Sequence, residues 1–199
     1  MSDDTPFASV KILGIDMQAT VESIDVEDHD RAIDRARVVF DSADDVSKIA
    51  REQQKVEISL GWTNENALIF AGVVMGVKNE ALGNGQQRVT VTAYDLSYRM
   101  KQGEPKKRSF NSGTLSDAIK ELVAEYATAG IQLGDIVPDP NPVLNKLQPL
   151  TKPNSQTDWD FIQEKAIQYH CRAFVEVNNE AVVFVFVDKL LCDIGCLGC

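Results

Sequence analysis

Long apolar runs are missing from this sequence of 199 residues. None approaches the roughly 18 to 20 consecutive apolar residues that cross a bilayer as a helix, so we expect no membrane span. The opening residues MSDDTPFASVKILG lack the basic and apolar regions of a secretory signal peptide. We therefore expect a protein that is made and kept in the cytoplasm.

Basic residues are also scarce. Twenty Lys and Arg stand against 30 Asp and Glu, which gives a net charge of -10. The first 45 residues hold twelve acidic and four basic side chains, a local balance of -8. Such a surface repels phosphate backbones, so we expect no sequence-specific binding of nucleic acid. The one dense basic segment, Arg99 to Arg108, contains Gly103 and Pro105 and no interleaved aromatic residue, which favours a solvated loop.

Few residues carry obvious catalytic chemistry. The two histidines are His29, in an acidic segment, and His170, at the end of a predicted helix, where a cation is favoured. Neither lies near a serine elbow, because NSGTLS at 111–116 is typical of a turn followed by a helix cap. The GNG at 83–85 lies between two predicted strands and not at the start of a helix, so it is no phosphate-binding loop. We expect a non-enzymatic protein without a cofactor.

Three of the four cysteines lie in the last eight residues, CDIGCLGC. Their spacing, C-x3-C-x2-C, resembles the motif with which radical S-adenosylmethionine enzymes hold an iron–sulfur cluster. Most of a barrel follows the motif in those enzymes, whereas this sequence stops at Cys199, and a zinc site would need a fourth ligand such as Cys171 or His170. We interpret these residues as free thiols. The alternative is a small metal-binding or iron–sulfur protein whose ligands are Cys192, Cys196 and Cys199.

The first half of the chain is rich in strand-like segments. The clearest is KVEISLGW, in which Val56, Ile58, Leu60 and Trp62 alternate with more polar or smaller residues. An Asn-Gly turn in 82–87 is typical of a hairpin. Closely spaced strands with few helices between them predict an antiparallel sandwich or barrel. The predicted strands cover 11–15, 21–27, 35–41, 55–62, 67–77 and 88–96, with one or two helical turns in 41–52.

The periodicity changes in the second half. From Thr114 apolar residues recur at helical spacing, with a capping-box variant completed by Asp117 and a stop at Gly130. A segment with five of the seven prolines, 136–155, predicts an extended connection. A second helix is expected from Ser155 or Thr157, followed by a hairpin over 173–187. We place the domain boundary between residues 103 and 104, with domains over 1–103 and 104–199.

The last predicted strand is apolar on both faces. A strand of this kind needs cover from two sides, and little sequence follows to supply it. We therefore expect a neighbouring polypeptide to cover it, which makes it a candidate assembly interface. Its residues are Val182, Val183, Phe184, Val185, Phe186 and Val187.

Several segments together resemble a known family. They are a strand ending in Ala93–Leu96, a Ser109–Phe110 pair, the capped helix from Thr114, and a helix that starts at Asp158–Phe161 and leads into a hairpin. In this order they are similar to the tail-hub proteins of contractile phages and related injection systems, over roughly residues 7 to 187. That group includes the late control protein D family and the N-terminal part of the valine-glycine-repeat spike proteins.

The resemblance implies a mainly β fold with α+β parts: an antiparallel tube-like β-barrel followed by an incomplete second barrel. It implies a trimeric baseplate hub, a homotrimer that joins the tail tube protein to the central spike protein in a virion or injection particle. Because the strands that would close the second barrel do not follow in this sequence, a second hub polypeptide is a further expected partner. A monomeric binding module, for example for carbohydrate, stays open as another alternative.

The acidic charge suggests a further hypothesis about such a hub. A channel through which DNA slides is expected to repel it, and an acidic lumen would do so. The candidate residues are Asp25, Glu27 and Asp28.

Overall fold

The structure is a computed structural model that describes residues 6–17, 20–29, 32–41, 44–62, 65–83, 85–178 and 181–189. The chain divides into two compact units. Unit 1 comprises the described residues up to His29, Ile33–Asp95 and residues 177–178, and unit 2 comprises residue 32, Leu96–Glu176 and the described residues from Ala181 onward. The change from unit 1 to unit 2 after Asp95 precedes the expected boundary at residue 103, so α2 (Ser97–Gln102) belongs to unit 2.

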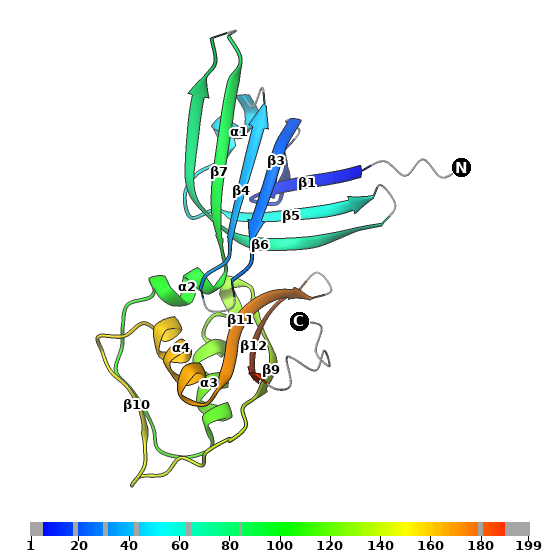
Figure 1. Ribbon diagram of the computed structural model, residues 1–199. Helices are drawn as coiled ribbons and strands as arrows, with labels where there is room; N and C mark the ends of the chain where they lie inside the picture. Colours follow the sequence, from blue (N-terminus) through cyan, green and yellow to red (C-terminus); the bar gives the residue numbers. More distant parts are fainter. Residues whose placement is uncertain are drawn as a thin grey trace. The chain divides into compact units, whose positions relative to one another are not determined.

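Unit 1 is built on one seven-stranded sheet, in the order β2-β1-β5-β6-β7-β4-β3, with antiparallel pairing throughout. The sheet curls into a half-barrel (Figure 1). It has two ends, because no described strand pairs with the outer edge of β3. The strands are β1 (Pro6–Ile12), β2 (Ile15–Asp16), β3 (Thr20–Glu27), β4 (Arg35–Asp41), β5 (Lys55–Trp62), β6 (Glu65–Ala81) and β7 (Gln87–Asp95).

The strand pattern of the first half is largely confirmed, with one correction at the start. β5 has the expected bounds, and Val56 and Ile58 on its inner face are buried. The prediction of one continuous strand over 11–15 is wrong. The chain turns at Leu13 and Gly14, which both have positive φ, so the strand β1 ends at Ile12. A left-handed residue pair interrupts the extended backbone, and the apolar residues on either side belong to different strands.

The core of unit 1 lies against the concave side of this sheet. Strand side chains such as Val38, Phe40 and Val91 are almost inaccessible to solvent. The short helix α1 (Asp44–Ile49) contributes Val46, and Ala50 follows it into the same core. The one or two helical turns expected in 41–52 are therefore confirmed, and they serve to cover the sheet.

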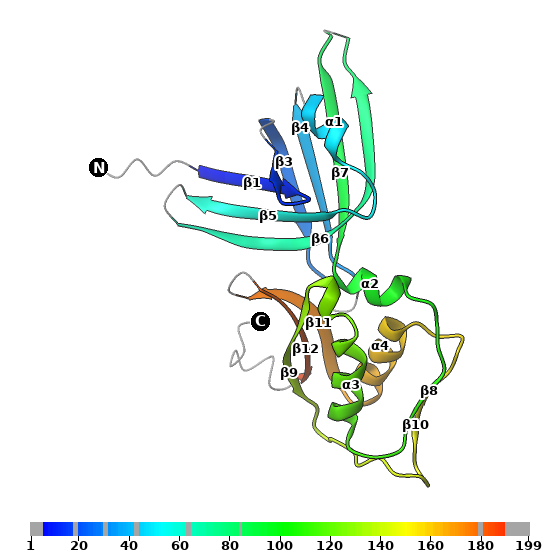
Figure 2. The ribbon, with the colours of Figure 1, turned by 180° about the vertical axis from the view of Figure 1, so that it is seen from behind.

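Unit 2 combines helices with two small sheets. In both views α3 and α4 lie together on one side of the sheet formed by β9, β11 and β12 (Figures 1 and 2). A second, two-stranded sheet pairs β8 with β10. The elements are α2, β8 (Arg108–Phe110), α3 (Leu115–Ala124), a 3-10 turn (Ala127–Ala129), β9 (Ile131–Val137), β10 (Leu150–Lys152), α4 (Asp158–Gln168), β11 (Cys171–Asn178) and β12 (Ala181–Asp188).

Both predicted helices form where the caps were expected. Thr114 accepts a hydrogen bond from the backbone N–H of Asp117, and the Asp117 carboxylate accepts one from the backbone N–H of Thr114. This reciprocal pair satisfies two amide groups that the first turn leaves without partners. The Thr114 hydroxyl also donates to the Asp117 carboxylate at 2.8 Å, and this bond, together with the one from the Thr114 N–H, holds the pKa of Asp117 below its usual range. Gly130, with φ of 97°, ends the 3-10 turn that follows α3. Thr157 caps α4 in a similar way, through the N–H of Asp160.

The mainly β fold with α+β parts is confirmed. The sheet of unit 1 is the tube-like element that the sequence predicted, in the form of an open half-barrel. The helices of unit 2 pack on a mixed sheet, because β12 runs parallel to β9.

Candidate functional site

The two ends of the unit 1 sheet present unpaired strand edges. β3 forms one end, and at the other end β2 pairs only with Lys11 and Ile12 of β1. The carbonyl of Val10 also accepts a hydrogen bond from the backbone N–H of Met17 at 2.9 Å. Only the outer backbone edge of Pro6 to Ser9 therefore has no strand beside it among the described residues. Exposed strand edges are templates for pairing with another chain, and natural proteins cover them or use them. These edges are the first candidate assembly surface.

An apolar arm extends from the core of unit 1 toward one of these edges. β1, β5 and β6 form it (Figure 1), and along β5 the inner face runs from buried Ile58 through partly buried Leu60 to Trp62, which is 50 % exposed. Gly61 has φ of 151°, and an added Cβ would lie 2.7 Å from the Cα of Asn66. The close approach of β5 and β6 at this point therefore requires glycine. A half-exposed tryptophan on a rigid hairpin is typical of a contact surface.

The acidic residues proposed for a channel lie in and after β3. Asp25, Glu27 and Asp28 are exposed. Arg35 of β4 binds Glu27 at 2.5 Å, and this hydrogen bond holds the pKa of Glu27 below its usual range. The charge of Glu27 is therefore partly compensated within the sheet, which sequence reasoning did not foresee.

The apolar strand predicted as an interface is β12, and it lies in the middle of its sheet. β11 pairs with one edge and β9 with the other. Five of its six apolar residues are buried, and Val183 is partly buried. The reason for expecting a neighbour, an exposed apolar strand, is therefore not found in the structure. Any strand added to this sheet would have to pair with β9 or β11.

The two outer strands of that sheet differ. The side-chain amide of Gln163 in α4 donates a hydrogen bond to the backbone carbonyl of Ala173 in β11 at 2.7 Å. This carbonyl of β11 therefore already has a partner from α4. β9 carries two half-exposed apolar side chains, Leu133 and Val137. Of the two strands, β9 has the more apolar exposed surface.

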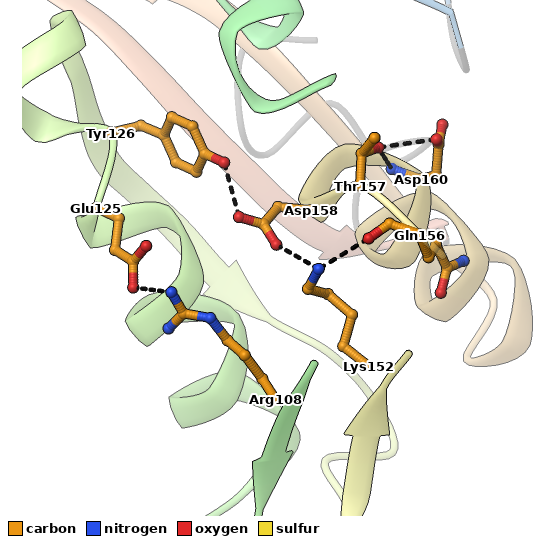
Figure 3. Close-up of polar contacts among 8 residues, drawn as sticks. All are labelled: Arg108, Glu125, Tyr126, Lys152, Gln156, Thr157, Asp158 and Asp160. Carbon is orange, nitrogen blue, oxygen red and sulfur yellow. Dashed lines mark hydrogen bonds and ion pairs between the residues drawn. The ribbon is translucent and has the colours of Figure 1, made fainter. Parts of the chain in front are cut away.

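Unit 2 also contains a buried ion pair that the sequence did not reveal. The Lys152 ammonium in β10 is fully buried and lies 3.0 Å from the Asp158 carboxylate, in the first turn of α4 (Figure 3). It also donates a hydrogen bond to the carbonyl of Gln156 at 2.8 Å. The Tyr126 hydroxyl donates to the other Asp158 oxygen at 2.7 Å. Burial and this hydrogen bond to Asp158 raise the pKa of Tyr126.

This network has a structural role. Lys152, Asp158 and Tyr126 come from the β8–β10 sheet, α4 and the turn after α3, so they tie three segments together (Figure 3). Each polar atom of the pair has a partner, which offsets the cost of taking a charge out of water. The lysine and the carboxylate neutralise each other within this network.

The basic segment 99–108 contains no assembled anion site. Arg99 and Lys101 lie on α2, and Lys101 is 3.7 Å from Asp160. Arg108, in β8, forms an ion pair with Glu125 after α3, and this contact raises the pKa of the guanidinium (Figure 3). The expected solvated loop is thus replaced in part by a helix and a strand whose charges pair with acids.

The remaining predicted site residues are cysteines and histidines. Cys192, Cys196 and Cys199 lie outside the described residues. Within the described ranges no group of three or more His, Cys, Asp or Glu side chains is arranged to hold a metal ion. Cys171 is buried, and burial raises the pKa of its thiol to about 11. His170 follows α4 with φ of 56°, and His29 lies 3.6 Å from Glu27.

The sequence matches the family described as Alg8 N-terminal domain over residues 4–186. No curated protein sequence matches the chain. Among the described residues, no helix is long and apolar enough to span a membrane.

Solved structures with a similar fold are components of tails and secretion systems. A tail protein from Neisseria meningitidis superimposes with a TM-score of 0.65 at 15% identity, over 90% of this chain and 51% of that one. A type VI secretion system component from E. coli, described as similar to T4 tail proteins, gives 0.63 at 15%, over 90% and 48%. A prophage tail protein from Shewanella oneidensis gives 0.65 at 13%, over 91% and 53%. This chain spans about half the length of these structures.

Proposed function

This chain belongs to the Alg8 N-terminal domain family, and from that membership and its fold we propose that it is a structural baseplate hub subunit of a contractile tail or injection system. In this proposal three copies form a ring that links the tail tube protein to the central spike protein. The observation that carries it is the fold that the chain shares with tail and type VI secretion proteins. The ring would assemble in the bacterial cytoplasm and reside in a virion or injection particle.

The unpaired edges of unit 1 support assembly into a ring. An open half-barrel has one free edge at each end, β1–β2 and β3. When the free edge of one copy meets the opposite edge of the next, the contact is head-to-tail, and such contacts close into a ring if the rotation allows it. Pairing between the strands gives partners to the backbone N–H and C=O groups of both edges, and the arm with Trp62 adds apolar area to the contact.

The central strand of unit 2 enters this proposal indirectly. Val182 to Val187 form the buried middle of a sheet, so we propose that they give the assembly interface a rigid base and that the contact itself is at β9. A strand from a second hub polypeptide that pairs with β9 would cover Leu133 and Val137 and complete a second barrel. The role is structural, in keeping with neighbours that are described as tail and secretion components.

The ring contact is tested by a pair of matched variants in sedimentation. Three chains of 22.0 kDa give about 66 kDa, and we expect this mass for the purified protein. Trp62→Lys places a charge in the proposed contact and should shift the protein toward a monomer. Leu147→Lys, at a side chain that is 94% exposed in unit 2, should leave the mass unchanged. A wild-type monomer at about 100 μM, or equal masses for both variants, would refute the ring contact at this arm.

The acidic channel is a separate part of the proposal. Reversing the charge of Asp25, Glu27 and Asp28 to Lys should slow DNA passage, because a basic lumen binds phosphates. Arg35→Gln, which releases Glu27 from its ion pair without adding positive charge, is the control. Unchanged DNA ejection from particles that carry the triple reversal would contradict the acidic channel and leave the ring untouched.

A further inference from the structure

Two aspartates are joined in unit 1 at the place where β4 begins and β7 ends. The backbone N–H of Asp34 donates to the Asp95 carboxylate at 2.8 Å, and the N–H of Asp95 donates to the backbone carbonyl of Asp34 at 3.0 Å. The Asp34 carboxylate in turn accepts from the backbone N–H of His29 at 2.8 Å. These three bonds join the residues on both sides of the β3–β4 connection to the last residue of β7.

The surroundings of Asp34 disfavour its charged form. Asp95 is only 6 % exposed and Asp34 is half-buried, so neither carboxylate is fully hydrated. Burial, together with the negative charges of Asp95 and Asp28, raises the pKa of Asp34 to about 7, although the hydrogen bond from His29 opposes the shift. The nearest guanidinium along the chain, Arg35, is engaged with Glu27.

We propose that Asp34 and Asp95 form a proton-responsive latch that fastens His29 and the start of β4 to the end of β7. With Asp34 protonated, its side chain keeps its half-buried position and the amide of His29 keeps its acceptor. With Asp34 ionised, repulsion from Asp95 and Asp28 drives its side chain toward water, and the His29 amide is released. The latch lies within unit 1 and does not depend on the proposed hub function.

The sign of the pH effect follows from the direction of the shift. Between the ordinary value of 3.8 and about 7, the folded chain binds more protons at Asp34 than the unfolded chain does. Stability from this group is therefore fully present below about pH 4 and is lost as the pH rises through 7. A fully coupled group would change the unfolding constant about tenfold per pH unit. Because Asp34 is partly exposed, we expect a few-fold per unit.

Carbon-detected NMR of the full chain tests the latch directly. We expect the Asp34 carboxyl to titrate near pH 7, and the His29 amide to lose about fivefold protection from exchange between pH 6 and 8, beyond the intrinsic rise in rate. Asp34→Asn keeps an oxygen acceptor without the charge, so it should hold the His29 amide protected over the whole range. Asp95→Asn removes the main repelling charge and should lower the Asp34 midpoint. Asp25→Asn, on exposed β3, should change neither measurement.

Two results would overturn the latch. One is an Asp34 midpoint below pH 5 in the wild type. The other is a loss of His29 protection with rising pH that is the same in the wild type and in Asp34→Asn. If Asp34→Asn does not fold, the midpoint of Asp34 in the Asp95→Asn variant decides, and an unshifted value refutes the proposal.

Discussion

The buried pair of Lys152 and Asp158 gives the sharpest test of what holds unit 2 together. Lys152→Met keeps the volume and apolar stem of the side chain but removes its charge. The Asp158 carboxylate, 14% exposed, then loses the ammonium of Lys152 and keeps the hydroxyl of Tyr126. Breaking a buried pair at one side costs roughly 3 to 5 kcal/mol, and we expect about 3 kcal/mol because Tyr126 stays in place. At about 4–8 °C per kcal/mol for a unit of this size, the melting temperature of unit 2 should fall by about 12–24 °C.

The fluorescence of Trp159 is the probe for this experiment. Trp159 follows Asp158 in α4 and is 3% exposed, and the only other tryptophan is Trp62 of unit 1. In a Trp62→Phe background the fluorescence therefore reports on unit 2 alone during urea unfolding. Unit 2 can then be followed without assuming that both units unfold together.

A double-mutant cycle separates the ion pair from general damage. Asp158→Asn keeps an acceptor for Tyr126 and leaves the Lys152 charge uncompensated, so it should also cost about 3 kcal/mol. The double variant buries no charge, and its cost should fall below the sum of the two by about 2 kcal/mol or more. Lys101→Met is the control, since Lys101 is 51% exposed and 3.7 Å from Asp160. Additive costs, or a Lys152→Met variant as stable as Lys101→Met, would refute the reasoning.

Other predictions follow from single features. Thr114→Ala removes the cap of α3 and should cost about 1 kcal/mol in urea unfolding, and no loss would mean that the capping box contributes nothing. Gly61→Ala forces a Cβ against the backbone of β6 and should cost about 2 kcal/mol, whereas Gly76→Ala, where the Cβ meets nothing within 4 Å, should be nearly neutral. Native Cys171 should resist iodoacetamide at pH 8, because burial keeps its thiol protonated. Protein purified without chelator should contain less than stoichiometric iron or zinc, and stoichiometric metal that is lost with the three C-terminal cysteines would favour the metal-binding alternative.

The elements that the sequence predicted best are those whose signals are local. In α3 the cap at Thr114 and apolar residues at helical spacing both lie within one segment, and they bury Leu115, Ile119 and Leu122. In β5 Val56 and Ile58 are buried and Glu57 between them is partly exposed, so alternation alone indicates a strand. Cap chemistry and periodicity act over a few residues. The elements they favour form in the folded protein because tertiary packing favours the same elements.

The elements that were missed depend on distant partners. β9 shows no alternation, because Gly134 interrupts it and its register with β12 shifts between Phe184 and Phe186. Its pairing with β12 is parallel and joins residues about 50 positions apart, such as Ile131 and Val182. Lys152 lies in a proline-rich segment that has the composition of a solvated loop. Only the fold brings it to Asp158, so no sequence pattern predicts its burial.

The apolar strand β12, which was expected to need a partner, also shows that a sequence pattern does not identify distant partners. Apolar residues on both faces do indicate a buried strand, and β12 is buried. The pattern does not say which chain supplies the cover. β9, an element that sequence analysis had not recognised, covers one edge of β12, and β11 covers the other.

Cryo-electron microscopy of the purified assembly tests the proposed hub most directly. We expect three copies around one axis, with the β3 edge of each unit 1 sheet beside the β1–β2 edge of the next copy. Single copies whose two sheet edges both face solvent, or a two-fold dimer that leaves these edges uncovered, would contradict the hub.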